Sequence, residues 1–152
     1  MPLSRRSFLT AGLGITVVTA ATSVGVTGYG RASAPGVKGD PFLLGVASGD
    51  PAPDGFVIWT RLALDPIAED GLGGMPNRNV PVQWEVAEDE KMTRVVARGT
   101  EQAVPDSAHS VHVELFGLRP GREYFYRFRT GSHMSAVGRA LTTPAATEIP
   151  AA

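Results

Sequence analysis

His109 and His112 are the side chains of this sequence best suited to binding a transition metal or transferring a proton near neutral pH. They lie three positions apart in a segment of alternating apolar residues, which predicts a strand. Three positions along a strand turn two side chains to opposite faces, so the pair cannot converge on one ion. We expect surface or edge histidines here and no metal pair.

Three aspartates and a glycine cluster are the other candidates for chemistry. Asp40, Asp50 and Asp54 carry the oxygen ligands that calcium prefers. Two of them flank Pro51-Ala52-Pro53, where aspartate usually bonds to the backbone of a turn, and we favour that interpretation. Residues 71–74, Gly-Leu-Gly-Gly, suggest a phosphate cradle, but no strand-to-helix transition follows and the P-loop lysine is missing. A flexible loop is expected.

Composition excludes several classes of function. The chain has 152 residues and no cysteine, which excludes disulfides, thiolate ligands and cysteine nucleophiles within it. When residues 1–34 are left out, Arg5, Arg6 and Arg31 leave the count with them. The rest of the chain then has 11 basic and 15 acidic residues, which is a net charge of −4. No basic stripe is present, so nucleic acid is not an expected partner.

The N-terminus predicts an export signal. Arg5 and Arg6 stand directly before a mildly apolar segment, and Phe8 and Leu9 follow where the twin-arginine pattern places apolar residues. Glycine, serine and threonine interrupt residues 11–26, so no stable membrane span is expected. We predict a signal peptide over residues 1–34, export by the twin-arginine translocase, and a location in the periplasm, cell wall or extracellular space. An ordinary secretory signal with a chance basic start is the alternative.

The elements that would position these residues are short strands, because apolar residues recur with period two and turn residues follow every 8–12 positions. The predicted strands are Phe42–Ser48, Phe56–Arg61, the strand with Val82, Trp84 and Val86, the edge strand Thr93–Thr100, the strand with Val111, Val113 and Leu115, the strand with Tyr124, Tyr126 and Phe128, and Met134–Leu141. Residues 62–79 form a long irregular stretch. About seven short strands predict an all-β sandwich of two sheets, like fibronectin type III and immunoglobulin domains.

One spacing supports this fold class. Leu118-x-Pro120-x-x-x-Tyr124-x-Tyr126 is similar to a tyrosine corner, in which the tyrosine ring packs in the core and its hydroxyl bonds to backbone upstream. Trp59 is expected to be the core tryptophan, and Trp84 to have a structural role as well.

Five motifs together resemble one known family. They are Phe42–Pro51, Phe56–Leu62, Tyr124–Arg129, Ser135–Arg139 and Thr142-Thr143-Pro144. In this order, from about residue 40 to 144, they resemble the N-terminal domain of the PhoD-like alkaline phosphatases. The resemblance implies an exported phosphomonoesterase or phosphodiesterase. In that family a sandwich domain precedes a larger metallophosphatase domain that binds iron and calcium.

The resemblance implies a layout of signal peptide 1–34, linker 35–41, sandwich 42–143 and the start of a second linker at 144–152. No catalytic or metal-binding residue of the family maps onto this chain, so iron, calcium and catalysis are expected in a domain that follows, and the chain alone is expected to be inactive. A free-standing fibronectin-like module that binds a wall polymer or a protein at the cell surface is the alternative. Aromatic residues on one exposed face would favour that module. An apolar patch near Ile58 and the last strand would favour a docked catalytic domain.

A last candidate surface consists of arginines. Arg127 and Arg129 are predicted to point away from the core, and Arg139 lies on the adjoining strand. They are expected to gather on one side of the sheet, where they would dock on the catalytic domain or attract anionic phosphate esters. The alternative is a solvated face that limits aggregation.

Overall fold

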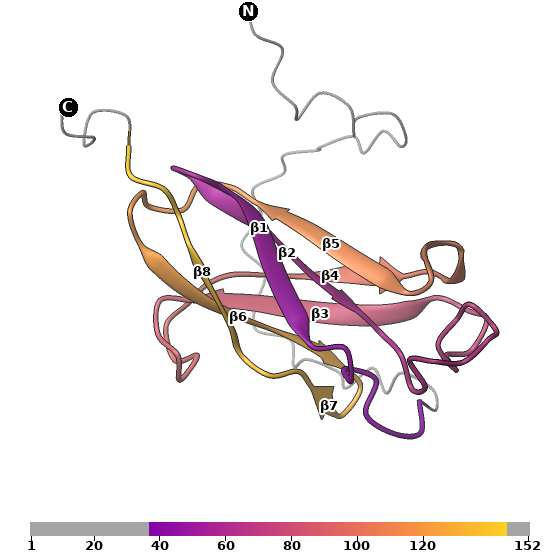
Figure 1. Cartoon of the computed structure of the whole chain (residues 1–152). Coiled ribbons are helices and arrows are strands. Elements are labelled where there is room, and N and C mark those ends of the chain that lie inside the picture. Colours follow the sequence, from indigo (N-terminus) through magenta and orange to yellow (C-terminus); the bar gives the residue numbers. More distant parts are fainter. Residues whose placement is uncertain (1–36, 146–152) are drawn as a thin grey trace, which may run out of the picture. The chain divides into compact units, whose positions relative to one another are not determined.

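The computed structural model describes residues 37–145, and the structural statements below concern that part of the chain. The predicted export signal, with Arg5, Arg6, Phe8 and Leu9, lies outside the described residues. Eight strands and one short 3-10 turn follow each other along the described part (Figure 1). They are β1 Val46–Ala52, β2 Gly55–Arg61, β3 Val80–Ala87, β4 Val95–Ala103, η2 Pro105–Ser107, β5 Ser110–Leu115, β6 Glu123–Thr130, β7 His133–Met134 and β8 Gly138–Leu141.

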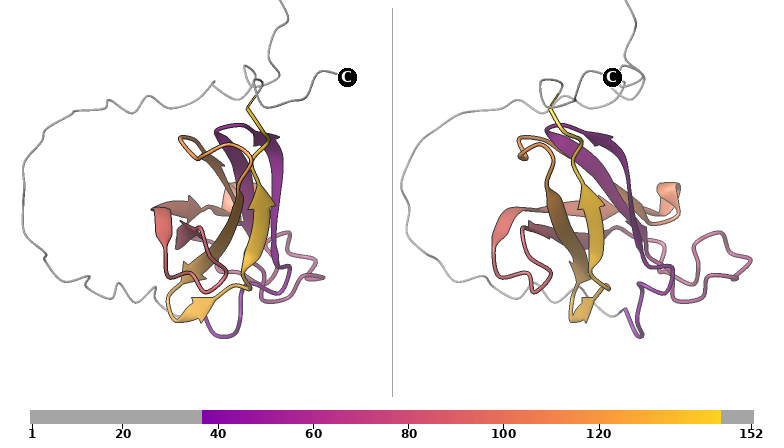
Figure 2. Two further views of the ribbon diagram at one scale, coloured as in Figure 1. Left: turned by 90° about the vertical axis from the view of Figure 1, so that its left-hand side faces the viewer. Right: turned by 60° about the vertical axis from the view of Figure 1, so that its left-hand side comes forward.

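The strands form two antiparallel sheets. One sheet has the order β1-β2-β5, and the other has the order β4-β3-β6, with β7 and β8 both paired to β6. The edge strands β1 and β8 run side by side where the two sheets meet, as both views of Figure 2 show. The expected all-β sandwich of two sheets is therefore confirmed.

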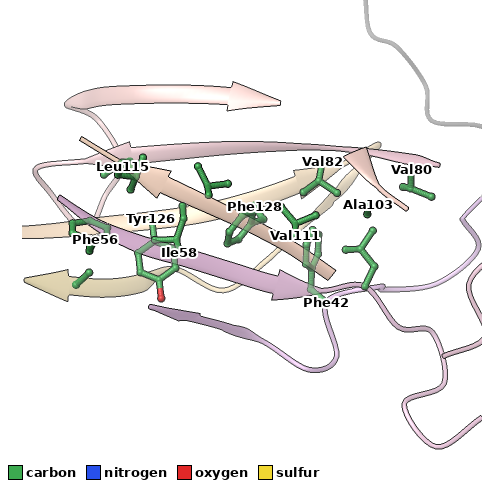
Figure 3. Close-up of a cluster of buried hydrophobic side chains, with 14 of the residues drawn as sticks. Phe42, Phe56, Ile58, Val80, Val82, Ala103, Val111, Leu115, Tyr126 and Phe128 are labelled. Atoms are coloured by element: carbon green, nitrogen blue, oxygen red, sulfur yellow. The ribbon is translucent and has the colours of Figure 1, made fainter. Parts of the chain in front are cut away.

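The core lies between the sheets and follows from the period of two. In β2, β3, β5 and β6, alternate side chains point inward, and most of these are apolar (Figure 3). The smaller sheet contributes Phe56, Ile58, Val111, Val113 and Leu115, and the larger sheet contributes Val80, Val82, Val86, Tyr124, Tyr126 and Phe128. Leu62 and Met75 from the irregular stretch and Phe42 from the segment before β1 complete the same cluster.

The bounds of several strands differ from the prediction, and the first and last strands differ most. The first strand does not begin at Phe42, because the backbone turns at Gly45, whose φ is +73° and whose amide bonds to the Phe42 carbonyl. It continues through Pro51 instead of ending at Ser48, since β1 is an edge strand and its pairing with β2 shifts between Gly49 and Ala52. The last predicted strand is divided into β7 and β8.

Trp59 is not the core tryptophan. Phe56, Ile58 and Thr60 are the buried residues of β2, so Trp59 belongs to the outward face with Val57 and Arg61. Its ring is half-buried and stacks on His112 of β5 with centroids 5.9 Å apart. Trp59 therefore covers the outer face of the three-stranded sheet.

Candidate functional site

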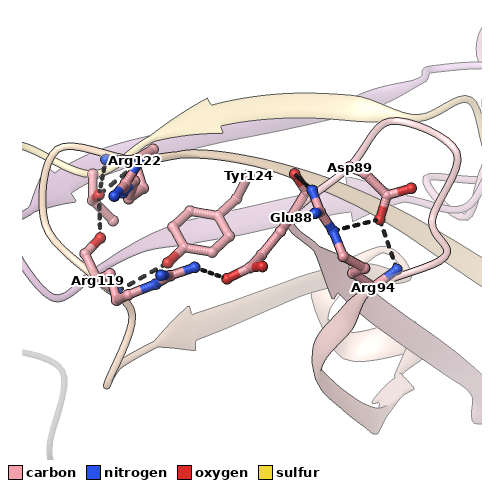
Figure 4. Close-up of polar contacts among 7 residues, drawn as sticks. Glu88, Asp89, Arg94, Arg119, Arg122 and Tyr124 are labelled. Atoms are coloured by element: carbon pink, nitrogen blue, oxygen red, sulfur yellow. Dashed lines mark hydrogen bonds and ion pairs between the residues drawn. The ribbon is translucent and has the colours of Figure 1, made fainter.

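The turn before β6 is held by Tyr124 (Figure 4). Tyr124 is 2% exposed, and its hydroxyl accepts the backbone N–H of Arg119 at 2.9 Å. The Arg119 side chain forms an ion pair with Glu88 in the turn between β3 and β4. Leu118 and Pro120 flank Arg119, and the Leu118 amide bonds to the Asp54 carbonyl. The Tyr124 hydroxyl therefore fixes a turn that also contacts the β1–β2 turn through Asp54 and the β3–β4 turn through Glu88.

Tyr126 and Trp84 each lie against a glycine on a neighbouring strand. A Cβ at Gly138 would lie 2.4 Å from Tyr126 Cζ, and a Cβ at Gly99 would lie 2.5 Å from Trp84 Cζ2. Burial raises the pKa of Tyr126 above its ordinary value of 10.0, and a hydrogen bond with the Ser48 side chain opposes this rise. Both aromatics therefore occupy space that only glycine leaves open.

The two histidines do not form a site. His112 is exposed on β5 and stacks on Trp59, but His109 is completely buried, so the expected surface position was wrong for it. His109 precedes β5 with a φ of +58°, which turns its ring inward, and its Nδ1 lies 3.2 Å from the Ala103 carbonyl. Its Nε2 has no hydrogen-bond partner among residues 37–145. His109 therefore closes the end of the core, while His112 lies outside it.

Asp40 and the glycine cluster have hydrogen bonds within their own turns. Asp40 accepts the Phe42 amide at 2.9 Å, and Asp70 accepts the amides of Leu72 and Gly74, so those two amides of the glycine cluster already have an acceptor. Asp50 near the end of β1 and Asp54 in the turn between β1 and β2 are both exposed. Within residues 37–145, no three histidine, aspartate or glutamate side chains come together to hold a metal ion. The described residues therefore do not fit iron or calcium.

The three predicted arginines lie on the outer face of the larger sheet, each with a partner. Arg127 donates from Nε and Nη2 to one oxygen of Glu85, at 3.0 and 2.8 Å. Arg139 pairs with Glu123 at 2.8 Å, and Arg129 donates to the Gly131 carbonyl. Gln83, Glu85, Arg127, Arg129 and Met134 line a small hollow on this face. Because glutamates offset two of the three charges, the surface offers weak attraction for an anion.

The end of β8 is fixed to both sheets, a feature that the sequence analysis missed. The Thr142 hydroxyl accepts the Arg122 amide at 3.0 Å and donates to the Arg119 carbonyl at 2.7 Å. The Thr143 amide donates to the Ala52 carbonyl of β1 at 3.1 Å. The sandwich was expected to end at residue 143, and these hydrogen bonds show how its last two residues are held.

Three of the eight large apolar side chains that are exposed among residues 37–145 lie just before this point. Met134, Val137 and Leu141 are 43%, 41% and 52% exposed. Leu141 points outward from β8, whereas its neighbour Ala140 is buried. Ser48, Gly49, Pro51, Phe56, Arg139, Ala140 and Leu141 line a hollow between β1 and β8. The edge of the sandwich near the last described residues therefore combines apolar surface with a concavity.

The sequence profile described as "PhoD-like phosphatase, N-terminal domain" matches residues 30–144. The chain belongs to this family. The PhoD-like domain of this chain is similar to alkaline phosphatase D of Bacillus subtilis (strain 168), with 52% identity over 133 residues that cover 88% of this chain and 21% of that protein. The chain thus spans about one fifth of the curated relative.

One solved structure agrees with this assignment. The structure of PhoD matches the PhoD-like domain with 55% identity and a TM-score of 0.70, over 74% of this chain and 21% of that one. A fibronectin type III domain from the human KIAA0970 protein also matches, at 12% identity and a TM-score of 0.45, over 84% of this chain and 93% of that one. Residues 37–145 contain no helix that is long and apolar enough to cross a membrane.

Proposed function

We propose that this chain is the non-catalytic N-terminal domain of an exported PhoD-like alkaline phosphatase, in which a following domain hydrolyses phosphate esters with bound metal ions. The observation that carries the proposal is the family match over residues 30–144 together with 52% identity to alkaline phosphatase D. In residues 37–145, no three histidine, aspartate or glutamate side chains converge as metal ligands would. The proposal therefore assigns the metal ions to the following domain. In this proposal the described domain packs and docks, and it performs no chemical step.

The exposed surface favours this domain over a free-standing binding module. A module that binds wall polymer would present several aromatic side chains on one open face. Phe116, just after β5, is 62% exposed, but Trp59 is half-buried against His112. Met134, Val137 and Leu141 expose apolar surface on β7, on β8 and between them, near the last strand, where an unpaired patch was expected for a docked catalytic domain. Ile58 is not part of that patch, because it is fully buried.

A chimera tests the proposal. In the Bacillus subtilis enzyme, the segment that matches this domain is replaced by residues 37–145 of this chain, and hydrolysis of p-nitrophenyl phosphate is measured with iron and calcium supplied. We expect the chimera to be active, the 152-residue chain alone to be inactive, and the enzyme without any N-terminal domain to lose stability or activity. Hydrolysis by the chain alone would contradict the proposal, as would full activity and stability of the enzyme without the domain.

Export is tested separately. Residues 1–34 are placed before a fluorescent reporter that matures only when it folds in the cytoplasm, and fluorescence in the periplasm is measured. We expect export that stops when Arg5→Lys and Arg6→Lys are introduced together, because the twin-arginine route reads the guanidinium pair. Export of the double-lysine variant at an unchanged level would show that an ordinary secretory signal is used.

A further inference from the structure

We propose that the outer face of β8 and its lead-in, defined here as the β8 surface of Val137, Arg139 and Leu141 with Phe125 of β6 beside it, is the docking surface for the polypeptide that follows Pro144. This inference rests on the proposed function, because it assigns the partner's position within a longer enzyme. The occupant is the next domain of the same chain.

The first argument is the contrast between the two edges of the larger sheet. Proteins usually place charges on an edge strand to prevent pairing with other chains. The β4 edge follows this pattern, with Arg94 and Arg98 exposed beside Val96. The opposite edge has Met134, Val137 and Leu141 exposed within eight residues, and Arg139 is the one charged side chain among residues 134–141. An edge with this much exposed apolar surface is typical of a surface that another part of the protein covers.

The second argument is the arrangement of charge around the apolar residues. Arg139 lies beside Phe125 in the strand register and pairs with Glu123. Arg127, two residues further along β6, pairs with Glu85. The basic side chains closest to the patch are therefore neutralised within the domain, and docking does not leave an unpaired buried charge. The β8 surface therefore has apolar residues on both sides of an ion-paired arginine, with Phe125 opposite that arginine on β6.

The third argument is the position of the tether. Thr142 and Thr143 are held by hydrogen bonds to Arg119, Arg122 and Ala52, so the chain leaves the sandwich at a fixed point two residues after Leu141. About four fifths of alkaline phosphatase D lies outside the match, since the match covers 21% of it. A domain joined by a short tether experiences a millimolar effective concentration at this surface, so a small apolar patch is sufficient for docking.

The test uses the chimera and two single variants. Leu141→Asp places a charge at one end of the β8 surface, and Val137→Asp places one at the other end. Val96→Asp is the matched control, because Val96 is 46% exposed on the opposite edge of the same sheet. The measurements are the number of calorimetric unfolding transitions and the rate of proteolytic cleavage after Pro144. The isolated 152-residue chain with each substitution reports any loss of stability of the domain itself.

We expect one coupled transition for the chimera and for Val96→Asp. Leu141→Asp and Val137→Asp should give two transitions and cleavage about 10-fold to 100-fold faster, as expected when one buried aliphatic side chain is lost from an interface. Unchanged transitions and cleavage in both variants would overturn the inference while leaving the proposed function intact. Two transitions in the unsubstituted chimera would instead contradict stable docking altogether. A dimer of the isolated chain that Leu141→Asp converts to a monomer would assign the surface to a second copy and also overturn the inference.

Discussion

Replacing Tyr124 by phenylalanine isolates the contribution of one hydroxyl to the stability of this sandwich. The ring would remain in the core, because Tyr124 is 2% exposed and packs against Phe56 with centroids 6.0 Å apart. The loss is a single acceptor, which leaves the Arg119 N–H without the partner that it has at 2.9 Å. The substitution therefore tests whether the turn before β6 depends on this bond or only on the packing of the ring.

The expected cost follows from the energetics of an unsatisfied buried donor. Leaving such a group without a partner costs about 1–3 kcal/mol, and we expect about 2 kcal/mol because the site is partly buried. With a urea m-value of about 1.5 kcal/mol per molar, the unfolding midpoint should fall by about 1.3 M. The assay is equilibrium unfolding in urea, followed by tryptophan fluorescence and by circular dichroism, so that two-state behaviour is checked at the same time.

Tyr126→Phe is the matched control. Its ring is also 2% exposed, but its hydroxyl bonds to a side chain, Ser48 on the partly exposed edge strand β1, where water can replace the lost partner. We expect a loss below about 1 kcal/mol for this variant. Equal losses for the two variants, or a loss below about 0.5 kcal/mol for Tyr124→Phe, would refute the assignment of a special role to the Tyr124–Arg119 bond.

Three further predictions concern other parts of the domain. Gly99→Ala should destabilise the fold by about 1–3 kcal/mol in urea unfolding, because the new Cβ would lie 2.5 Å from Trp84 Cζ2, whereas Gly49→Ala, 3.1 Å from the half-buried Trp59 Cζ3, should cost less. The backbone amide of Thr93 is the main cause that holds the pKa of Asp89 below its ordinary 3.8, so the stability from this carboxylate is present above about pH 4 and is lost as pH falls through the lower folded pKa. Urea unfolding of the unsubstituted chain and of Asp89→Asn should be measured at several pH values from about 5 to about 2, on both sides of 3.8. The difference between their unfolding free energies should shrink as the pH falls, and a constant difference would contradict this prediction. In the chimera, the double substitution Arg127→Gln and Arg129→Gln should leave the salt dependence of kcat/KM within about twofold of the unsubstituted value, because Glu85 already offsets the charge of Arg127. A much weaker salt dependence in the double variant would show that these arginines attract phosphate esters.

The sequence predicts the strands whose apolar residues alternate without ambiguity. Residues 111–115 and 124–128 have this pattern, and β5 and β6 bury the expected side chains. The segment before β1 does not alternate, since Phe42-Leu43-Leu44 is a continuous apolar run. Only Phe42 is buried, because the turn at Gly45 leaves Leu43 and Leu44 exposed. A continuous run gives no register, so the boundary of this strand could not be read from its residues.

Trp59 shows how a register error arises from residues that are apolar on both faces. Residues 56–60, Phe-Val-Ile-Trp-Thr, offer two possible inward faces, and the larger aromatic suggests the wrong one. Arg61 indicates which face is outward, because it shares a face with Trp59 and its guanidinium group needs a polar partner. It finds one in the carbonyl of Ala108 at 3.1 Å. Inspection of the polar residue at the end of the run would have assigned Phe56 and Ile58 to the core.

The burial of His109 and the contacts of the two threonines after β8 could not be predicted, because distant parts of the chain supply them. The burial of His109 depends on a left-handed backbone at a non-glycine residue and on the Ala103 carbonyl across the η2 turn. Thr142 is 1% exposed and bonds to Arg119 and Arg122, more than 19 positions earlier in the sequence. A sequence window around either residue contains none of these partners.

The threonines also change what the end of the domain implies for a longer enzyme. A flexible linker after β8 would allow the next domain to rotate freely, and a contact with the β8 surface would then have to overcome that freedom. Hydrogen bonds at Thr142 and Thr143 remove this freedom up to the residue before Pro144, and proline restricts the next backbone angle. Because the same turn is held by Tyr124 through Arg119, the hydroxyl that stabilises the sandwich also fixes the direction in which the chain leaves it. In the longer enzyme proposed above, the stability of this domain and the placement of the next one would therefore be coupled through the backbone of Arg119.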